Sequence, residues 1–336
     1  SPMLKIAHLI DDTTAGGVTR YLDFLRQDPR LGRQADHQVI EVKRNRPGGV
    51  PADADIIVSH LAVSWAGLPG MIALRARHAG TPLVHVEHSY SEGFAALNVT
   101  SRTRFQCLLR STYSLFDRVV AVSDAQAGWL ARNGLARMDT LDVIPPMVDL
   151  TALEDIAAPE GPVRKIAAIG RLDRQKGFDM LIRAFRLVED PDLTLTFFGD
   201  GDARDELLAL AAGDSRIRFA GFAVNPAAAY AGSDLVVMPS RWEPYGLVAA
   251  EANVAGRRVL MSCVDGLQDQ APRGNPIVGE PTVAAWADAL TRIAGRPAAL
   301  AQRPTAASLR NETITGWERL LDALTGQPAE ATAQTA

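Results

Sequence analysis

Residues 4–27 read LKIAHLIDDTTAGGVTRYLDFLRQ. A short apolar run at residues 4–10 comes first and predicts a strand. A loop with Gly16 and Gly17 follows, and apolar residues then recur at helical spacing. A strand, a glycine loop and a helix in this order are typical of the opening of a nucleotide-binding α/β domain. The two glycines would let the backbone approach a phosphate or a sugar, but the full G-x-G-x-x-G pattern is absent.

Apolar strands alternate with helical stretches through the rest of the chain. We expect two doubly wound α/β domains that face each other across a cleft, with ligands at the carboxyl ends of the strands. The expected domains are residues 1–150 and 151–314, followed by a helix and tail at 315–336, for which packing on the N-terminal domain is one expectation. Further strands are predicted at residues 37–42, 55–60, 82–87, 118–123, 141–145, 165–170, 193–199, 217–221, 234–240 and 258–262.

Composition narrows the class of protein. The chain has 336 residues, of which 47% are hydrophobic and 22% charged, and its net charge is −4. This length suits two domains, and the negative charge argues against nucleic acid as a partner. Two cysteines cannot build a disulfide framework, and we recognise neither a signal peptide nor a run able to cross a bilayer. We therefore expect a cytoplasmic protein.

The strongest motif is SRWEPYGLVAAE at residues 240–251. A loop presents Glu243 after a strand, and Gly246 opens a helix that carries Glu251. Carboxylates grip sugar hydroxyls well, and the helix start favours an anion such as phosphate. The competing interpretation is a capped amphipathic helix with a solvated Glu251. The amides expected at this helix start belong to Tyr245, Gly246, Leu247 and Val248.

Two further motifs follow predicted strands. In GRLDRQKG (residues 170–177), Arg171 and Lys176 are placed to converge on a diphosphate, and the alternative is a solvated basic loop. In HVEH (residues 85–88), two histidines three apart on a strand point to opposite faces, which argues against a shared metal ion. We expect His85 to pack in the sheet and His88, at the strand end, to be functional.

Together these motifs resemble the retaining glycosyltransferases of the GT-B fold, specifically family 4 (group 1). Glu243 and Glu251 match its E-x7-E pattern, and residues 116–130, 170–185 and 197–211 resemble further family segments in the family's order. Two departures stand out. Tyr245 replaces a common phenylalanine, and MSCVDGLQDQ at residues 261–270 stands where glycines usually lead to a glutamate.

The resemblance implies a role for each matching residue. Arg171 and Lys176 would hold the donor diphosphate, Glu243 the transferred sugar and Glu251 the ribose. His88 would contact the sugar near the reacting carbon, so His88, Glu243, Arg171 and Lys176 form the expected catalytic set. The remaining expected donor contacts are Gly16 and Gly17 on the opposite wall, Phe222 and Ala223 along the base, and the amides of Tyr245, Gly246, Leu247 and Val248. No metal and no cofactor is expected, because the nucleotide sugar is a substrate.

The resemblance also implies a reaction: transfer of a sugar, with retention, from a nucleotide-diphosphate sugar to a hydroxyl. UDP is favoured over GDP, because residues 224–233 hold no lysine to favour guanine. The expected acceptor is a saccharide or lipid-linked intermediate of bacterial surface polysaccharide synthesis. Residues 101–118 combine an apolar stripe with arginines, which suits either contact with the inner face of a membrane or a core-packed helix with a basic face.

Other activities stay open at this point. A nucleotide-sugar 2-epimerase of the same fold and a non-enzymatic sugar- or nucleotide-binding protein are the alternatives. A glycoside hydrolase would also use two carboxylates, but it would not need Arg171, Lys176 or a helix start suited to phosphate.

Overall fold

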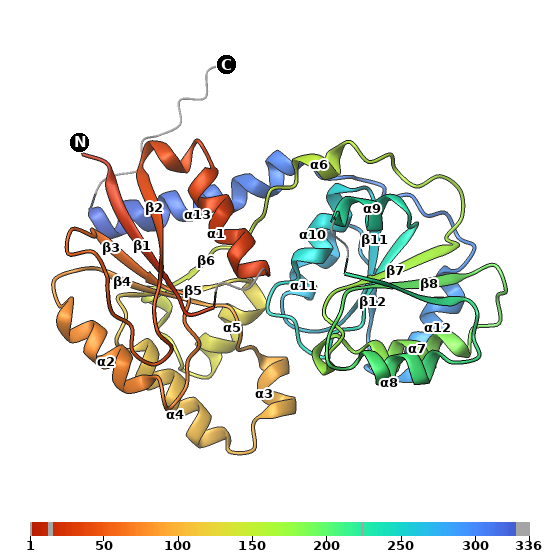
Figure 1. Cartoon of the computed structure of the whole chain (residues 1–336), viewed down its shortest axis with the longest axis horizontal. Coiled ribbons are helices and arrows are strands. Elements are labelled where there is room, and N and C mark those ends of the chain that lie inside the picture. The colour runs from red at the N-terminus through yellow and green to blue at the C-terminus, as the bar shows by residue number, and fades with distance from the viewer. Residues whose placement is uncertain (1, 13–15, 223–224, 327–336) are drawn as a thin grey trace. The chain divides into compact units, whose positions relative to one another are not determined.

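The chain divides into two compact units. The computed structural model describes residues 2–12, 16–222 and 225–326. Unit 1 comprises residues 1–90, 98–148 and the chain from Arg310 onward, and unit 2 comprises residues 91–97 and 149–309. Within the described residues, each unit holds a six-stranded parallel sheet flanked by helices (Figure 1). The expected α/β class is thereby confirmed.

Unit 1 has the strand order β2-β1-β3-β4-β5-β6. The order reverses between β1 and β3, which makes this the switch point where ligands bind in doubly wound sheets. Its strands and helices are β1 (Leu4–Ile10), α1 (Gly17–Gln27), β2 (Ala35–Glu41), β3 (Ile56–Ser59), α2 (Leu68–Arg77), β4 (Leu83–Glu87), α4 (Arg102–Tyr113), β5 (Arg118–Ala121), α5 (Asp124–Arg132) and β6 (Leu141–Val143), with 3₁₀ turns at Leu31–Arg33 and Met138–Thr140.

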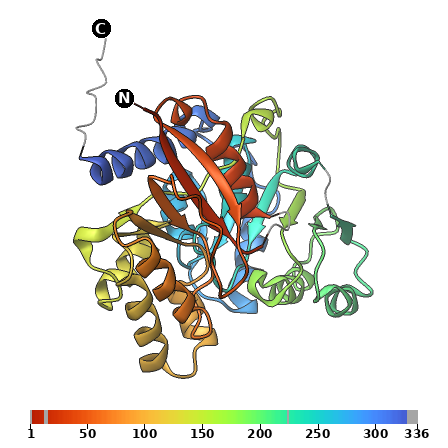
Figure 2. The same cartoon turned by 60° about the vertical axis from the view of Figure 1, so that its left-hand side comes forward.

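Helices cover both faces of the unit-1 sheet. Helices α2 and α4 lie side by side on one face (Figure 2), where Met71 and Leu74 pack against strand residues such as Leu9 and Ile57. The other face is covered by α1 and by the part of α13 (Ala306–Thr325) that belongs to unit 1. There the Trp317 Nε1–H donates a 2.7 Å hydrogen bond to the Tyr21 hydroxyl.

Unit 2 has the strand order β12-β11-β10-β7-β8-β9, which reverses between β7 and β10. This is the order of a dinucleotide-binding sheet. Its elements are α6 (Thr151–Glu154), β7 (Lys165–Ile169), α7 (Phe178–Arg186), β8 (Thr194–Phe198), α8 (Arg204–Ala211), β9 (Ile217–Gly221), α9 (Pro226–Ala231), β10 (Leu235–Met238), α10 (Leu247–Val254), β11 (Arg258–Ser262), α11 (Leu267–Gln270), β12 (Ile277–Val278) and α12 (Val283–Ile293), with 3₁₀ turns at Arg174–Lys176 and Ala271–Arg273. Residues 91–97 add most of α3 (Glu92–Asn98).

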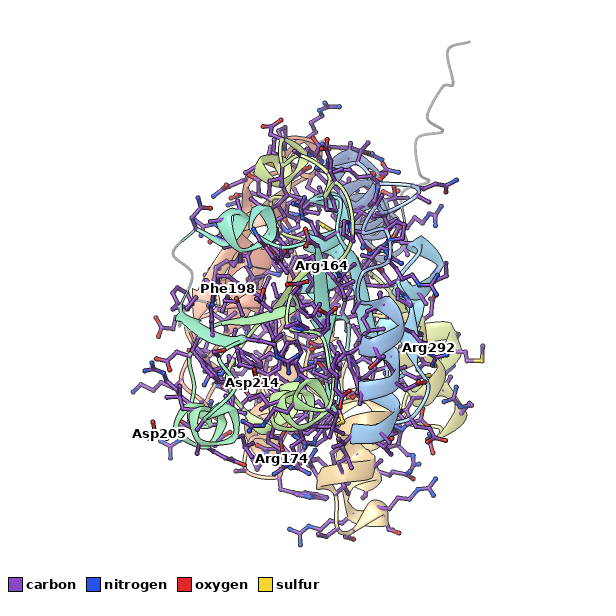
Figure 3. The ribbon with its side chains drawn as sticks, turned by 90° about the vertical axis from the view of Figure 1, so that its right-hand side faces the viewer. Arg164, Arg174, Phe198, Asp205, Asp214 and Arg292 are labelled. Atoms are coloured by element: carbon purple, nitrogen blue, oxygen red, sulfur yellow. The ribbon has the colours of Figure 1, made fainter. Side chains whose placement is uncertain are left out.

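The core of unit 2 lies mainly between the sheet and helices α7, α8 and α12. Phe185 and Trp286 are fully buried there, at the centre of an apolar cluster that reaches strands β7, β8 and β10. The surface side of the same helices is charged, as Asp205 on α8 and Arg292 on α12 illustrate (Figure 3). Helices α9 and α10 cover the opposite face.

The predicted strands all form, with ends that differ by no more than a few residues. The short strand β12 was not predicted, because two residues give no periodic signal. The C-terminal helix begins at Ala306, earlier than the sequence suggested.

Most of the stripe at residues 101–118 forms helix α4 (Arg102–Tyr113), whose Leu108, Leu109 and Tyr113 are buried. This agrees with the core-packed interpretation of the stripe. Two arginines of α4 are held by unit 1 itself: Arg110 donates to the carbonyls of Asn133 and Gly134, and Arg104 stacks over Trp65. Contact with a membrane stays a prediction. None of the helices in the described segments is both long enough and apolar enough to span a bilayer.

Candidate active site

The motifs of residues 170–177 and 240–251 meet at the switch point of the unit-2 sheet. Strands β7 and β10 are neighbours, although β8 and β9 lie between them in sequence. Their carboxyl ends lead directly into the two motifs. The topology therefore places the predicted cations and carboxylates where a doubly wound sheet binds its ligand.

Lys176 and Glu243 form the polar centre of this site. The Lys176 Nζ lies 2.9 Å from the Glu243 Oε2, and the Ser240 hydroxyl donates to the same oxygen at 3.0 Å. Only 8% of Glu243 is exposed, so the ion pair is largely shielded from water. The alternative of a solvated basic loop is wrong for Lys176. It does describe Arg171, whose side chain is 71% exposed and whose Nε lies 3.6 Å from the Asp173 Oδ2.

A short turn holds Lys176 in place. Residues 174–176 form a 3₁₀ turn that Asp173 caps, because the carboxylate of Asp173 accepts a 3.3 Å hydrogen bond from the Lys176 amide. Gly177 then adopts φ 69°, and a Cβ there would lie 2.1 Å from the Pro239 carbonyl oxygen. Both the left-handed conformation and the close approach require glycine. Gly177 therefore lets residues 174–177, which we call the lysine loop, pack directly against Pro239, the residue that follows β10.

Helix α10 begins directly after the predicted glycine, Gly246. Gly246 has φ 96°, and a Cβ at this position would lie 2.6 Å from a Leu267 methyl. The Gln270 side-chain amide donates to the carbonyls of Tyr245 and Gly246, at 2.8 and 2.9 Å, which fixes the turn before the helix. Tyr245 is buried, and Leu247 and Val248 are the first two residues of the helix.

Glu251 lies inside the protein rather than in solvent. It is 3% exposed, and the Tyr230 hydroxyl donates to its Oε2 at 3.4 Å. The interpretation of α10 as an amphipathic helix with a solvated glutamate is therefore wrong. Ala249, Ala250 and Ala252 on the same helix are also fully buried. A buried carboxylate needs a polar partner, and the Tyr230 hydroxyl is one.

Sequence reasoning missed Asp265. Its carboxylate accepts three hydrogen bonds: from the Glu243 amide at 3.0 Å, the Ser91 hydroxyl at 2.8 Å and the Gly93 amide at 3.0 Å. The side chain is 5% exposed, and its backbone has φ 45°, which is rare for a residue other than glycine. Asp265 lies in the segment that departs from the family pattern, and that departure was the available signal.

His88 follows β4 at the carboxyl edge of the unit-1 sheet and is partly exposed. The preceding Glu87 shapes this turn, because its carboxylate accepts hydrogen bonds from the amides of Ser89 and Tyr90 and from the Tyr113 hydroxyl. Burial raises the pKa of Glu87, but hydrogen bonds and charge from His85 and Tyr113 outweigh that effect and hold the pKa below its usual value.

The other predicted residues are described here within their own units. His85 is fully buried, with its Nδ1 3.2 Å from the Ser59 hydroxyl. Gly16 caps helix α1, which begins at Gly17. Phe222 follows β9 and is 74% exposed, whereas Ala223 lies outside the described residues. In the described parts of the chain, no three His, Cys, Asp or Glu side chains gather as metal ligands do.

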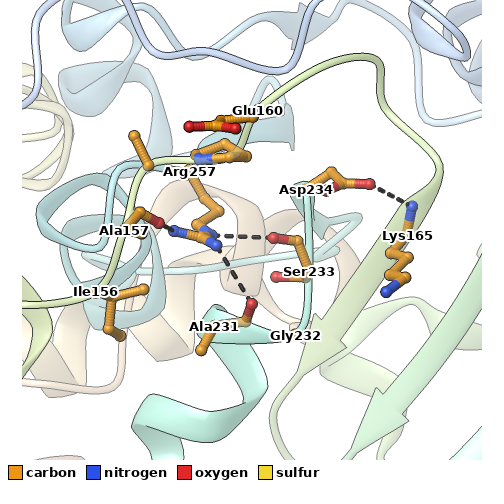
Figure 4. Close-up of a pocket in the computed structure, with 11 residues that line it drawn as sticks. Ile156, Ala157, Glu160, Lys165, Ala231, Gly232, Ser233, Asp234 and Arg257 are labelled. Carbon is orange, nitrogen blue, oxygen red and sulfur yellow. Dashed lines mark hydrogen bonds between the residues drawn. The ribbon is translucent and has the colours of Figure 1, made fainter.

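A cavity of about 350 Å³ opens at the other edge of the unit-2 sheet (Figure 4). It lies at the amino ends of β7, β10 and β11, lined by residues that include Lys165, Asp234 and Arg257. The Arg257 guanidinium donates to the carbonyls of Ala157, Ala231 and Ser233, so it links the backbone around Ala157 to that around Ala231 and Ser233. The cavity is thus separate from the site at the carboxyl edge.

Comparison with known proteins identifies the family. A model described as "Glycosyltransferase Family 4" matches residues 11–152, and one described as "Glycosyl transferases group 1" matches residues 163–296. A D-inositol 3-phosphate glycosyltransferase from a species of Arthrobacter is 32% identical over 308 residues, covering 84% of this chain and 72% of that protein. The chain belongs to the group 1 glycosyltransferases of family 4. A second such relative, from Pseudarthrobacter chlorophenolicus, is 30% identical over 87% of this chain and 73% of its own length.

Solved structures give the fold of this glycosyltransferase. Sucrose-phosphate synthase from Thermosynechococcus elongatus superposes with a TM-score of 0.74 at 19% identity, covering 97% of this chain and all of that one. Anabaena HepE in complex with UDP and glucose gives a TM-score of 0.67 at 18% identity, over 96% and 99% of the two chains. These likenesses and the two parallel sheets confirm the GT-B fold that the motifs predicted.

Proposed function

We propose that this glycosyltransferase transfers a sugar from a nucleotide-diphosphate sugar, with UDP as the favoured nucleotide, to a hydroxyl acceptor. The observation that carries the proposal is the Lys176–Glu243 pair at the unit-2 switch point. It combines a cation for the diphosphate with a carboxylate for sugar hydroxyls. The UDP complexes of the structural neighbour HepE support the choice of nucleotide.

In the proposed reaction, the bond from the anomeric carbon to the β-phosphate oxygen breaks and a bond to the acceptor oxygen forms. The nucleoside diphosphate and the acceptor's hydroxyl proton are released. Negative charge builds on the departing phosphate, and we assign its stabilisation to Lys176, Arg171 and the start of α10. Glu243 would orient the sugar and Glu251 the ribose. With these cations in that role, no metal is required, and we propose retention of configuration.

We place the acceptor in unit 1, at a groove of about 200 Å³ beside the carboxyl ends of β1 and β3. Asp11 and Arg44 line it, with the Arg44 Nε 3.2 Å from the Asp11 Oδ2. A carboxylate suits acceptor hydroxyls, and an exposed guanidinium suits a phosphate. The groove therefore fits a phosphorylated polyol or sugar. The relatives named D-inositol 3-phosphate glycosyltransferase support including that compound, alongside the saccharide and lipid-linked acceptors of surface polysaccharide synthesis.

A screen of nucleotide sugars tests the donor. UDP should raise the unfolding temperature more than GDP at equal concentration, and UDP-sugars should be consumed fastest in the presence of acceptor. The anomeric configuration of the product, read by NMR, decides retention. Full activity in EDTA is expected. An unchanged unfolding temperature with every nucleotide would overturn the proposed donor class.

Two further experiments test for epimerase activity and for the proposed acceptor groove. Incubation with donor alone should leave the sugar unepimerised, and an epimerised sugar would favour the 2-epimerase. Arg44→Ala should raise the KM for a phosphorylated acceptor and leave the KM for donor unchanged. A non-enzymatic sugar-binding protein would bind saccharide, would show no shift in unfolding temperature with UDP, and would consume neither the nucleotide sugar nor the acceptor.

A further inference from the structure

Four of the six histidines of the chain form one row across the unit-1 sheet. The neighbouring strands β2, β1, β3 and β4 lie in that order. Each contributes one histidine, either within the strand or directly after it: His37, His8, His60 and His88.

The strand register makes the row diagonal. His37 pairs with Ile6, two residues before His8, and His8 pairs with Val58, two residues before His60. Residues two apart on a strand point to the same face, so these side chains all lie on one side of the sheet. Each step to the next strand also climbs toward the carboxyl edge, where His88 lies.

The rings are joined end to end by hydrogen bonds. The distances from His37 Nδ1 to His8 Nε2, from His8 Nδ1 to His60 Nε2 and from His60 Nδ1 to His88 Nε2 are each 2.8 Å. His8, His37 and His60 are at most 8% exposed. Each link runs from an Nδ1 to an Nε2, so the four imidazoles form a single directional chain.

Two aromatic residues from helices α13 and α1 pack against the row of histidines. Trp317 packs edge-on against His8 and His37, and Tyr21 packs edge-on against His88. The indole N–H of Trp317 is already donated to Tyr21. The outer ring nitrogen of His37, Nε2, is buried and finds no hydrogen-bond partner among the described residues.

The number of protons restricts the tautomers. Four neutral imidazoles carry four ring protons, three of which occupy the three hydrogen bonds. The fourth must lie at one end, either on the Nδ1 of His88 or on the Nε2 of His37. The second arrangement would bury an unpartnered N–H, which is the rarer defect in proteins, whereas the first leaves only an unused lone pair.

We propose that the chain His37–His8–His60 is a positioning device that holds His88 as its Nδ1–H tautomer, with that N–H directed outward as a hydrogen-bond donor. All four histidines then carry their proton on Nδ1. Charged and titratable neighbours lie at both ends of the row, namely Asp28 and Asp36 toward His37, and Glu87 and His85 toward His88. The consequence for catalysis rests on the proposed function: His88 would donate to an oxygen of the donor sugar rather than accept from it.

Imidazole ¹⁵N NMR on the full chain at neutral pH tests this directly. The Nδ1–H and Nε2–H tautomers give distinct patterns of ring-nitrogen shifts, and single substitutions assign the six residues. We expect the Nδ1–H pattern for His8, His37, His60 and His88. His78, which lies outside the row, is the internal control. The Nε2–H pattern at His88, or a rapid mixture of both, would overturn the proposal.

A matched pair of substitutions at His60 tests the control of His88. Asparagine and aspartate have nearly the same shape, and both lose the contact to His8. His60→Asn still offers a donor to the His88 Nε2, so His88 should keep the Nδ1–H pattern. His60→Asp offers only an acceptor, so His88 should change to Nε2–H and its pKa should rise by about one pH unit or more. Identical His88 spectra in the two variants would contradict the proposal.

Kinetics then separate this inference from the proposed function. If both hold, His60→Asp should lower kcat by about tenfold or more relative to His60→Asn, with the donor KM similar in the two variants. If the tautomers are as expected but the wild type transfers no sugar, the proposed function fails and the positioning chain stands. Should His60→Asp not fold, the wild-type and His60→Asn spectra still decide the tautomer.

Discussion

The Lys176 ammonium lies 2.9 Å from the Glu243 carboxylate, although 67 positions separate the two residues in the sequence. The contact arises because β7 and β10 are adjacent at the switch point of the unit-2 sheet. Ser240 donates to the same carboxylate oxygen, and Asp265 holds the Glu243 amide. The proposed site therefore has its central charges positioned by the fold itself.

Removing either member of this pair should abolish most activity. Lys176→Ala and Glu243→Ala are each expected to lower kcat by about 100-fold or more, because stabilisation of the departing phosphate or orientation of the sugar is lost. Lys165→Ala, an exposed lysine at the other edge of the same sheet, is the control and should be neutral. Circular dichroism should show an intact fold in all three variants. Near-normal turnover in both site variants would contradict the assignment of Lys176 and Glu243 to the donor site.

Gly177 should tolerate no side chain. Gly177→Ala places a Cβ about 2.1 Å from the Pro239 carbonyl oxygen in an unfavourable backbone conformation, so the lysine loop must move. We expect a loss of roughly 1–3 kcal/mol in the free energy of unfolding and a marked loss of kcat. Gly279→Ala is the matched control, because open space surrounds that glycine. Equal denaturation midpoints for the two variants would show that the contact is not restrictive.

The carboxylate of Asp265 should hold residues 91–97 against the loop that carries Glu243, because it accepts hydrogen bonds from both segments. Asp265→Ala leaves the amides of Glu243 and Gly93 and the Ser91 hydroxyl without their acceptor, at a cost of about 1–3 kcal/mol or more in unfolding free energy. Hydrogen exchange should accelerate at residues 91–97 and around Glu243. Asp192→Asn, on an exposed turn, is the control. Unchanged exchange in the Asp265 variant would mean that other contacts hold the segment.

Acid should destabilise unit 1 at pH values above those at which ordinary carboxylates are protonated. Burial lowers the pKa of His37 and of His88 to about 4, and it lowers the pKa values of His8 and His60 as well. Unfolded histidines take up protons below about pH 6.5, whereas the folded ones do not. The free energy of unfolding should therefore be at its plateau above pH 6.5 and fall as the pH drops toward 4.

Thermal unfolding between pH 7.5 and pH 4.5 measures this effect. Replacing one member of the row, as in His37→Phe, should make the decline shallower, since one fewer buried imidazole must be protonated on unfolding. His78, which lies outside the row, provides the comparison through His78→Phe. A wild-type unfolding temperature that is flat down to pH 5 would argue against the neutral, buried state of these histidines.

The sequence by itself was sufficient for all the strands except β12, for the α/β class and for the family. Strand ends at Leu4–Ile10, Ile217–Gly221 and Arg258–Ser262 were predicted to the residue, because apolar runs bounded by glycine, proline or charge are local signals. The motifs around Lys176, Glu243 and Glu251 were also found in this way, since each occupies one contiguous stretch.

Only the tertiary structure decided which of these residues touch. The order of strands in a sheet is not written in any local stretch, so neither the Lys176–Glu243 pair nor the reach of Asp265 to Ser91 could be predicted. The histidine row shows the same principle. Six histidines within the first 88 residues were visible, but strand order and register alone bring four of them onto one face at 2.8 Å spacing. Strand order and register are set by packing and hydrogen bonding between segments that are far apart in sequence, so no single stretch of the chain determines which side chains meet.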